Sequence, residues 1–134
     1  LMIRRPPRDT QGYSSSAAAV SKRQIQGADP IAGARALGNK IFYVHGKDAR
    51  IERGLADVDG LLENLPVDHS AERTWNYVAG GCGKDLQWWK EFFSVAHMMG
   101  YDGCYVSLEM EDLTMSTEAG LATSIEALKA TISR

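Results

Sequence analysis

The sequence predicts an α/β fold, part of a parallel (β/α) barrel, on three observations. Two apolar runs typical of strands, 40–46 and 103–109, alternate with helical patterns, which predicts right-handed crossovers and a parallel sheet. Each run leads into charged or metal-binding side chains, as barrel strands do at their carboxyl ends. The chain has 134 residues, whereas a closed eight-stranded barrel needs about 250, so we expect two βα units and a preceding helix.

The composition is that of a globular domain and argues against several function classes. Hydrophobic residues make up 44% and charged residues 24%, and the formal net charge of -2 argues against a general nucleic-acid surface. No apolar run approaches the roughly 18 residues that cross a bilayer, so we expect a soluble protein without a membrane partner. Cys82 and Cys104 are too few for a disulfide framework, which favours a reducing compartment and predicts a cytoplasmic protein.

Two parts of the chain differ in character. Residues 1–24 combine an arginine and proline run, Arg4 to Arg8, with a serine and alanine run, Ser14 to Ala19. Because this composition offers no periodic apolar face, we expect the segment to be poorly ordered and outside the family fold. Residues 25–134 carry regular patterns and are long enough to form one folding unit with its own core.

The first predicted elements are a short helix over 30–37 and a strand over 40–46. Asp29 stands at the N-cap position, Pro30 suits the first helical position, and Gly38 is a typical stop. These three signals bound the helix closely.

The connection 47–84 has little periodicity. Within it, only 51–65 carries spaced apolar residues, Leu55, Val58, Leu61 and Leu62, which predict an irregular helical stretch. Connections of this length are usually functional, so we expect part of the site here.

An amphipathic helix, a second strand and a final helix complete the predicted unit. Asp85 caps the first helix, Gly100 ends it, and the strand spans 103–109. Ser116 caps the last helix, with Glu118 favourably placed in its first turn. The residues expected to be buried are Leu86, Trp89, Phe93, Ala96 and Met99 in one helix and Leu121, Ile125, Leu128 and Ile132 in the other. Because two strands cannot close a barrel, their open edges predict self-association.

Two strand-end side chains are the candidate metal ligands. The neutral imidazole of His45 binds divalent transition metals, and a strand end fixes its direction. The carboxylate of Glu109 ends the second strand, where it needs a partner or a metal, which makes it a candidate ligand and catalytic base. The alternatives are a hydrogen-bonded structural histidine and a solvated acidic loop that includes Glu111 and Asp112.

Three further residues are candidate substrate contacts: Lys47, Arg50 and Trp75. The guanidinium of Arg50 can grip a hydroxyl, carboxylate or phosphate, although a solvated surface position fits it as well. Lys47 has an alternative partner in Asp48, next to it in the chain. The glycine-rich turn 80–83 permits close approach of a ligand, but it matches neither a P-loop nor a dinucleotide-binding fingerprint.

Taken together, three segments resemble a known family. They are His45 to Arg50, Arg73 to Tyr77 with the following glycine turn, and Gly100 to Asp112. In this order they resemble the carboxyl-terminal part of the sugar phosphate isomerase/epimerase family, which has the xylose isomerase-like TIM barrel. The resemblance covers about Gln26 to Ile132 and implies that the two βα units are the last two of the barrel.

The resemblance implies an isomerase or epimerase of a sugar or sugar phosphate, with a divalent metal held by Glu, Asp, His and Glu at four strand ends. His45 corresponds to the histidine ligand and Glu109 to the last glutamate. Carboxylates would move a carbon-bound proton through an enediolate, with Glu109 as ligand and acid or base and Arg50 orienting the sugar. Manganese or magnesium suits an oxygen-rich site, and zinc also accepts histidine with carboxylates.

The chain departs from the family pattern near its start. Family members carry an Asp-Pro-Ser-His segment before the first helix, and counting back places Ala19 and Lys22 at the two ligand positions. The first glutamate would lie still further upstream. With two of the four ligands present, we expect this chain alone to be catalytically impaired. The alternatives are a dehydratase or metallohydrolase of the same barrel superfamily and a noncatalytic fragment.

Overall fold

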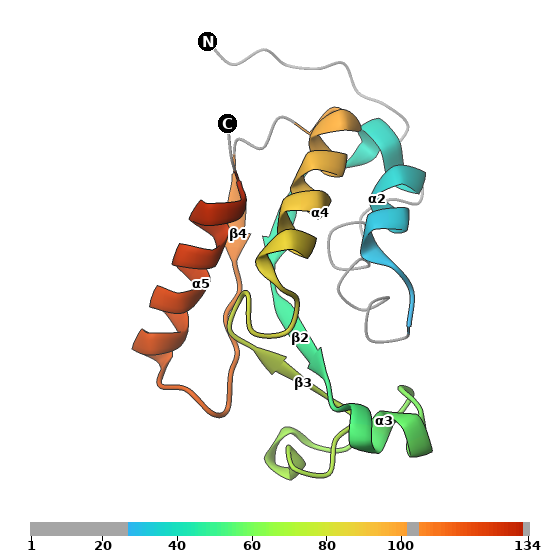
Figure 1. Cartoon of the computed structure of the whole chain (residues 1–134), viewed down its shortest axis with the longest axis vertical. Helices are drawn as coiled ribbons and strands as arrows, with labels where there is room; N and C mark the ends of the chain where they lie inside the picture. The colour runs from blue at the N-terminus through green and yellow to red at the C-terminus, as the bar shows by residue number, and fades with distance from the viewer. Residues whose placement is uncertain (1–26, 102–104, 133–134) are drawn as a thin grey trace.

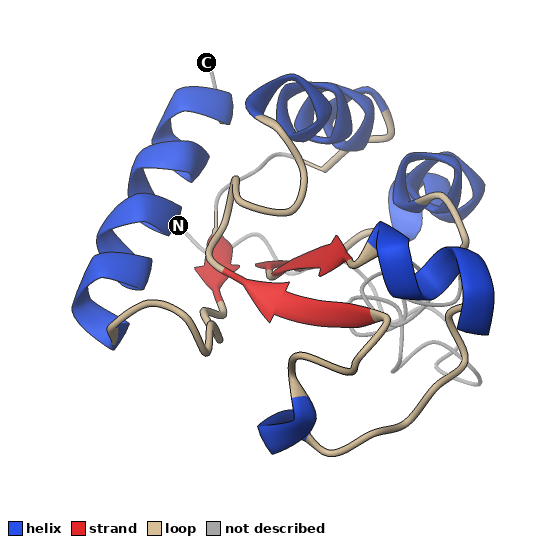
Figure 2. Ribbon diagram, turned by 60° about the horizontal axis from the view of Figure 1, so that its bottom comes forward, coloured by secondary structure: helices blue, strands red, loops and turns tan. Residues whose placement is uncertain are grey.

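Helices form an arc around short strands in the computed structural model, which describes residues 27–101 and 105–132 (Figures 1 and 2). The elements are α2 (Pro30–Leu37), η1 (Gly38–Lys40), β1 (Val44–Gly46), β2 (Asp48–Ile51), α3 (Arg53–Asp59), η2 (Val67–His69), β3 (Trp75–Val78), α4 (Leu86–Met98), β4 (Val106–Leu108) and α5 (Thr117–Thr131). The segment 1–24, predicted to be poorly ordered, lies outside the described residues. None of the described helices is long and apolar enough to span a membrane.

Two strand pairs form the centre of the fold. β1 and β4 are parallel, with His45 opposite Ser107 and Gly46 opposite Leu108. β2 and β3 are antiparallel, with Arg50 opposite Asn76. The predicted α/β class with parallel strands is therefore confirmed, and the described residues form part of a barrel rather than a closed one.

The strands differ from the predicted ranges in three ways. β1 covers only the end of the predicted strand 40–46, since η1 takes up its first position. β4 lies within the predicted strand 103–109, of which positions 103 and 104 fall outside the described residues. The antiparallel pair β2 and β3 was not predicted, because each strand has four residues and its partner lies more than 20 positions away.

The core lies between α2 and α4 and against β1. Asp29 caps α2 and Asp85 caps α4, as predicted, since each side chain accepts a hydrogen bond from a backbone N–H in the first turn. α4 packs between α2 and α5. The buried core residues are Ile31, Ala34, Val44, Trp89, Phe92, Phe93, Val95, Ala96 and Tyr101. The predicted buried face of α4 is correct at Trp89, Phe93 and Ala96, whereas Leu86 is exposed and Met99 is half-buried.

The helical stretch predicted over 51–65 is shorter than expected and has no buried face. α3 ends at Asp59, and none of its residues is buried. Val58 and Leu62 are 82% and 81% exposed. The prediction of a buried helical face from apolar spacing is therefore wrong here, because no described element packs over Val58 and Leu62.

The buried face of α5 also differs from the prediction. Ser116 caps the helix as expected, but Leu121 and Ile125 are exposed. The residues that face inward are Gly120, Ser124, Ala127 and Thr131, while Leu128 and Ile132 pack partly against the core. The physical reason is close approach: the Gly80 N–H donates to Ser124 Oγ at 2.8 Å, and a Cβ at Gly80 would lie 3.3 Å from the Ser124 Cβ. Larger side chains would hold helix and turn apart.

Candidate metal centre and adjoining cleft

The parallel pairing of β1 and β4 brings His45 and Glu109 together. Glu109 follows β4 directly, and its N–H donates to the Gly46 carbonyl at 3.2 Å, which extends the pairing by one residue. His45 Nδ1 lies 3.6 Å from Glu109 Oε2. Both side chains are substantially exposed, at 41% and 51%, so the pair faces solvent at the carboxyl edge of the two strands.

This pair fits the donor set of a divalent ion. Two ligand atoms that each lie about 2.1 Å from one ion are separated by about 3 to 4 Å, which includes the observed spacing. An imidazole nitrogen with a carboxylate oxygen suits manganese or zinc, and the carboxylate also suits magnesium. Within 27–101 and 105–132, however, no three His, Cys, Asp or Glu side chains come together in a group that could hold a metal.

Lys47, the one residue between β1 and β2, joins the acidic residues of the 109–111 loop. Its Nζ donates to Glu109 Oε1 and to Glu111 Oε2, both at 2.8 Å. It also lies 3.9 Å from the centroid of the Tyr77 ring. Burial alone would lower the pKa of Lys47, but the two carboxylates outweigh it and raise that pKa. The hydrogen bond from Lys47 likewise lowers the pKa of Glu109 against a smaller opposing effect of burial.

Asp48 does not pair with Lys47, because its carboxylate is buried in the glycine-rich turn. It accepts hydrogen bonds from the backbone N–H groups of Ala49, Gly81, Gly83 and Lys84, at 2.8 to 3.1 Å. Burial raises the pKa of Asp48, and the backbone hydrogen bonds oppose this shift without cancelling it. The amides that a phosphate would need in this turn are therefore already occupied by a side chain of the protein.

The sequence reasoning missed the role of Asp48. The available signal was the turn itself, since several glycines expose backbone N–H groups that need an acceptor. The sequence does not show which carboxylate is that acceptor, because the contact between Asp48 and Lys84 joins residues 36 positions apart.

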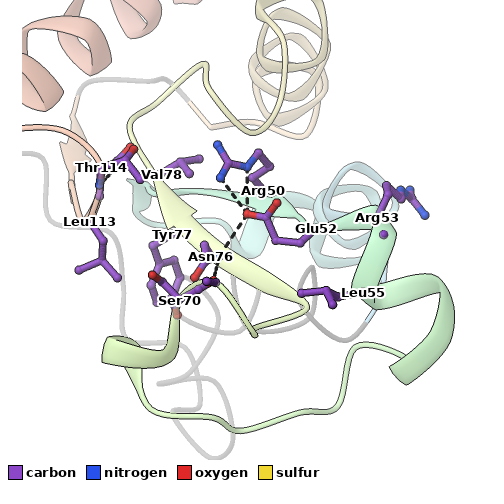
Figure 3. A pocket seen from close by; sticks show the side chains of 13 residues that line it. Arg50, Glu52, Arg53, Leu55, Ser70, Asn76, Tyr77, Val78, Leu113 and Thr114 are labelled. Atoms are coloured by element: carbon purple, nitrogen blue, oxygen red, sulfur yellow. Dashed lines mark hydrogen bonds and ion pairs between the residues drawn. The ribbon is translucent and has the colours of Figure 1, made fainter.

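A cleft of about 470 Å³ adjoins this region and contains Arg50 (Figure 3). Glu52 Oε1 accepts from Arg50 Nη2 at 2.8 Å, from Arg50 Nε at 3.0 Å and from Asn76 Nδ2 at 3.1 Å. Asn76 Nδ2 also donates to the Ser70 carbonyl, and the buried Asn76 Oδ1 has no hydrogen-bond partner among the described residues. The half-exposed Arg50 guanidinium therefore offers donors to a polar ligand in the cleft, whereas the Asn76 amide oxygen is buried.

The far wall of the cleft is held by Asp112. Its Oδ2 accepts from the Ala79 N–H at 2.9 Å, and its Oδ1 accepts from the N–H and the hydroxyl of Thr114, both at 2.8 Å. Burial tends to raise the pKa of Asp112, but these hydrogen bonds lower it overall. The Asp112 carboxylate thus stabilises the conformation of its loop.

Trp75, predicted to contact substrate, does not line this cleft. Its ring lies 4.2 Å from the Arg73 guanidinium and packs edge-on against Tyr77. Arg50 is therefore the predicted substrate contact that the structure places in the cleft.

Removing the Arg50 guanidinium is expected to raise the pKa of Glu52. The hydrogen bond from Arg50 is the main cause that holds this pKa below its ordinary value of 4.5. The ion pair therefore stabilises the fold at pH above 4.5 and loses this effect as the pH falls through the lowered pKa. In Arg50→Met, carboxyl NMR titration should show a higher Glu52 pKa, and stability should depend less on pH in this window. Arg53→Met, which alters an exposed side chain 3.8 Å from Asp57, is the control and should leave the Glu52 pKa unchanged.

The fold and the paired strand ends agree with a comparison of the sequence with known families. Residues 20–131 match the family described as xylose isomerase-like TIM barrel. The chain belongs to this family. The xylose isomerase-like family includes sugar isomerases and epimerases, is generally enzymatic, and often uses divalent metals. The family expected from the sequence is therefore confirmed.

A relative in Bacillus subtilis strain 168 is similar over most of the chain. It is named an uncharacterised protein, YfiH, and is 69% identical over 108 residues. The match covers 81% of this chain and 34% of the relative. The chain thus spans about a third of the length of this relative.

Proposed function

We propose that this protein supplies part of the active site of a divalent-metal-dependent isomerase or epimerase of a sugar or sugar phosphate. The observation that carries the proposal is the 3.6 Å approach of His45 Nδ1 to Glu109 Oε2 at the end of two parallel strands. Strand ends of this kind hold the catalytic groups of parallel barrels. Membership of the xylose isomerase-like family supports the same reaction class.

In this proposal His45 and Glu109 hold the ion, and Glu109 also takes part in proton transfer that leads to an enediolate. A bound divalent ion would stabilise negative charge on neighbouring substrate oxygens. The lowered pKa of Glu109 keeps its carboxylate ionised at neutral pH, which both a ligand and a proton acceptor require.

Arg50 orients the sugar in the adjoining cleft. Its Nε and Nη2 are held by Glu52, so the guanidinium is fixed in direction. No hydrogen bond within the part of the chain that the structure describes uses its Nη1, which can donate to a hydroxyl or phosphate oxygen. Trp75 would act indirectly, by supporting Tyr77 at the wall of the cleft.

The ligand roles predict a loss of manganese binding in two variants. His45→Ala removes one of two donors, and Glu109→Gln replaces the other, a charged carboxylate, with a neutral amide. Isothermal titration of the purified chain with Mn²⁺ should therefore show affinity at least about tenfold weaker than wild type for each. His97→Ala is the matched control, because His97 is exposed on α4, and it should bind as the wild type does.

Unchanged Mn²⁺ affinity in both variants would contradict the ligand roles and favour the noncatalytic alternative. Catalysis is tested separately, by assaying the purified chain for sugar epimerisation with and without Mn²⁺. We expect little turnover, because two ligand positions expected from the family are Ala19 and Lys22. Robust metal-dependent turnover would show that this chain is not impaired.

A further inference from the structure

The ammonium group of Lys47 is fully committed within the protein. Its Nζ donates to Glu109 and to Glu111, both at 2.8 Å, and lies 3.9 Å from the centroid of the Tyr77 ring. The Lys47 side chain is 12% exposed, whereas the side chains of Glu109 and Glu111 are 51% and 41% exposed. A cation held in this way is poorly placed to bind a substrate oxygen and well placed to neutralise the two carboxylates.

Lys47 and His45 share one acidic partner, Glu109. Glu109 divides its oxygens, with Oε2 towards His45 and Oε1 towards Lys47. Glu111 turns its Oε2 to Lys47, and it does not complete a three-residue metal-binding group with the other two among the described residues. The three charged side chains Lys47, Glu109 and Glu111 carry a net charge of -1, and without Lys47 the two carboxylates carry -2.

We propose that Lys47 is a built-in counter-cation that restrains metal binding at the His45 and Glu109 pair. Lys47 occupies one oxygen of Glu109 and holds Glu111 in an ion pair, so that Glu111 does not bind the metal. Its positive charge also repels a divalent cation. A neutral side chain of similar length at this position releases Glu111 and yields a three-ligand site of two carboxylates and an imidazole. This inference rests on the ligand roles given to His45 and Glu109 above.

The test is isothermal titration with Mn²⁺ of the wild type, Lys47→Met, Lys47→Arg and Lys47→Met combined with Glu111→Gln. Methionine keeps much of the packing over Tyr77, and we expect Lys47→Met to bind Mn²⁺ at least about tenfold more tightly than wild type. Lys47→Arg keeps the charge and should bind like the wild type. The double variant should lose most of the gain, because it lacks the third ligand.

Two controls make the outcome decisive. Lys90→Met removes one exposed positive charge on α4 and should leave Mn²⁺ affinity unchanged. Circular dichroism and thermal melting establish that each variant is folded, and Lys47→Gln replaces the methionine variant if that one does not fold.

A folded Lys47→Met or Lys47→Gln that binds Mn²⁺ no more tightly than wild type overturns the proposal. An equal gain in Mn²⁺ affinity in the double variant also overturns the proposal, since Glu111 would then contribute nothing to the binding of the ion. These results differ from failure of the ligand roles themselves, in which Glu109→Gln would leave the affinity of the otherwise wild-type chain unchanged.

Discussion

Asp48→Ala is expected to lower the free energy of unfolding by about 3 kcal/mol or more, because it leaves several buried backbone donors without an acceptor. The Asp48 side chain is 1% exposed and accepts hydrogen bonds from four backbone N–H groups. Three of these N–H groups belong to Gly81, Gly83 and Lys84, and they have no other acceptor among the hydrogen bonds of the described residues. A loss of this size is a large part of the roughly 5 to 15 kcal/mol that stabilises an ordinary domain.

Urea denaturation followed by tryptophan fluorescence measures the effect, since Trp89 is buried in the core. Asp57→Ala is the matched control: it removes a carboxylate that is 67% exposed and 3.8 Å from Arg53, and the change should stay within about 0.5 kcal/mol. An unfolding midpoint of Asp48→Ala equal to that of the control would show that water replaces the carboxylate in the turn.

Gly83→Ala is expected to destabilise the fold by about 2 to 3 kcal/mol, through overpacking in the same turn. An added Cβ would lie 2.4 Å from the Ala49 carbonyl oxygen and 2.7 Å from Asp48 Oδ1. The first of these atoms belongs to the backbone of β2, so relief requires the turn to move away from the strand. That movement would lengthen the hydrogen bonds from the turn to Asp48.

Gly33→Ala is a control with the opposite expected sign. A Cβ at Gly33, inside α2, meets nothing within 4 Å, and alanine favours the helix over glycine by roughly 0.5 to 1 kcal/mol. Thermal denaturation of the two variants should therefore shift the melting temperature in opposite directions. A Gly83→Ala variant as stable as wild type would mean that the turn packs less tightly on β2 than its geometry indicates.

The importance of this turn extends to the candidate site. Asp48 and Lys47 are adjacent, and they turn to different partners, one to the glycine-rich turn and the other to the 109–111 loop. Holding Asp48 in the turn therefore fixes the backbone from which Lys47 reaches Glu109. Loss of the Asp48 anchor is thus expected to loosen the candidate metal centre as well as the fold.

Signals within a few residues predicted the elements that depend on local contacts. Asp29, Asp85 and Ser116 each cap the helix that follows, because a capping side chain bonds only to the first turn of its own helix. The order of strands and helices predicted that β1 and β4 would be parallel neighbours. That pairing alone places His45 beside Glu109.

Contacts between distant segments could not be predicted in the same way. The inward face of α5 is set by the glycine turn that packs on it, so Ser124 is buried and Ile125 is exposed, against the apolar pattern. The four-residue segment β3 is a strand because it pairs with β2. In both cases the partner surface, and not the segment's own pattern, decided the outcome.

The amino-acid sequence by itself determined the α/β class, the helix caps, the family and the two strand ends that carry His45 and Glu109. Only the tertiary structure decided that Lys47 binds residues 62 and 64 positions away, and that Asp48 serves the turn rather than its neighbour. The physical reason is that periodicity and capping act over a few residues, whereas a charged side chain selects its partner from all the groups that folding brings within reach.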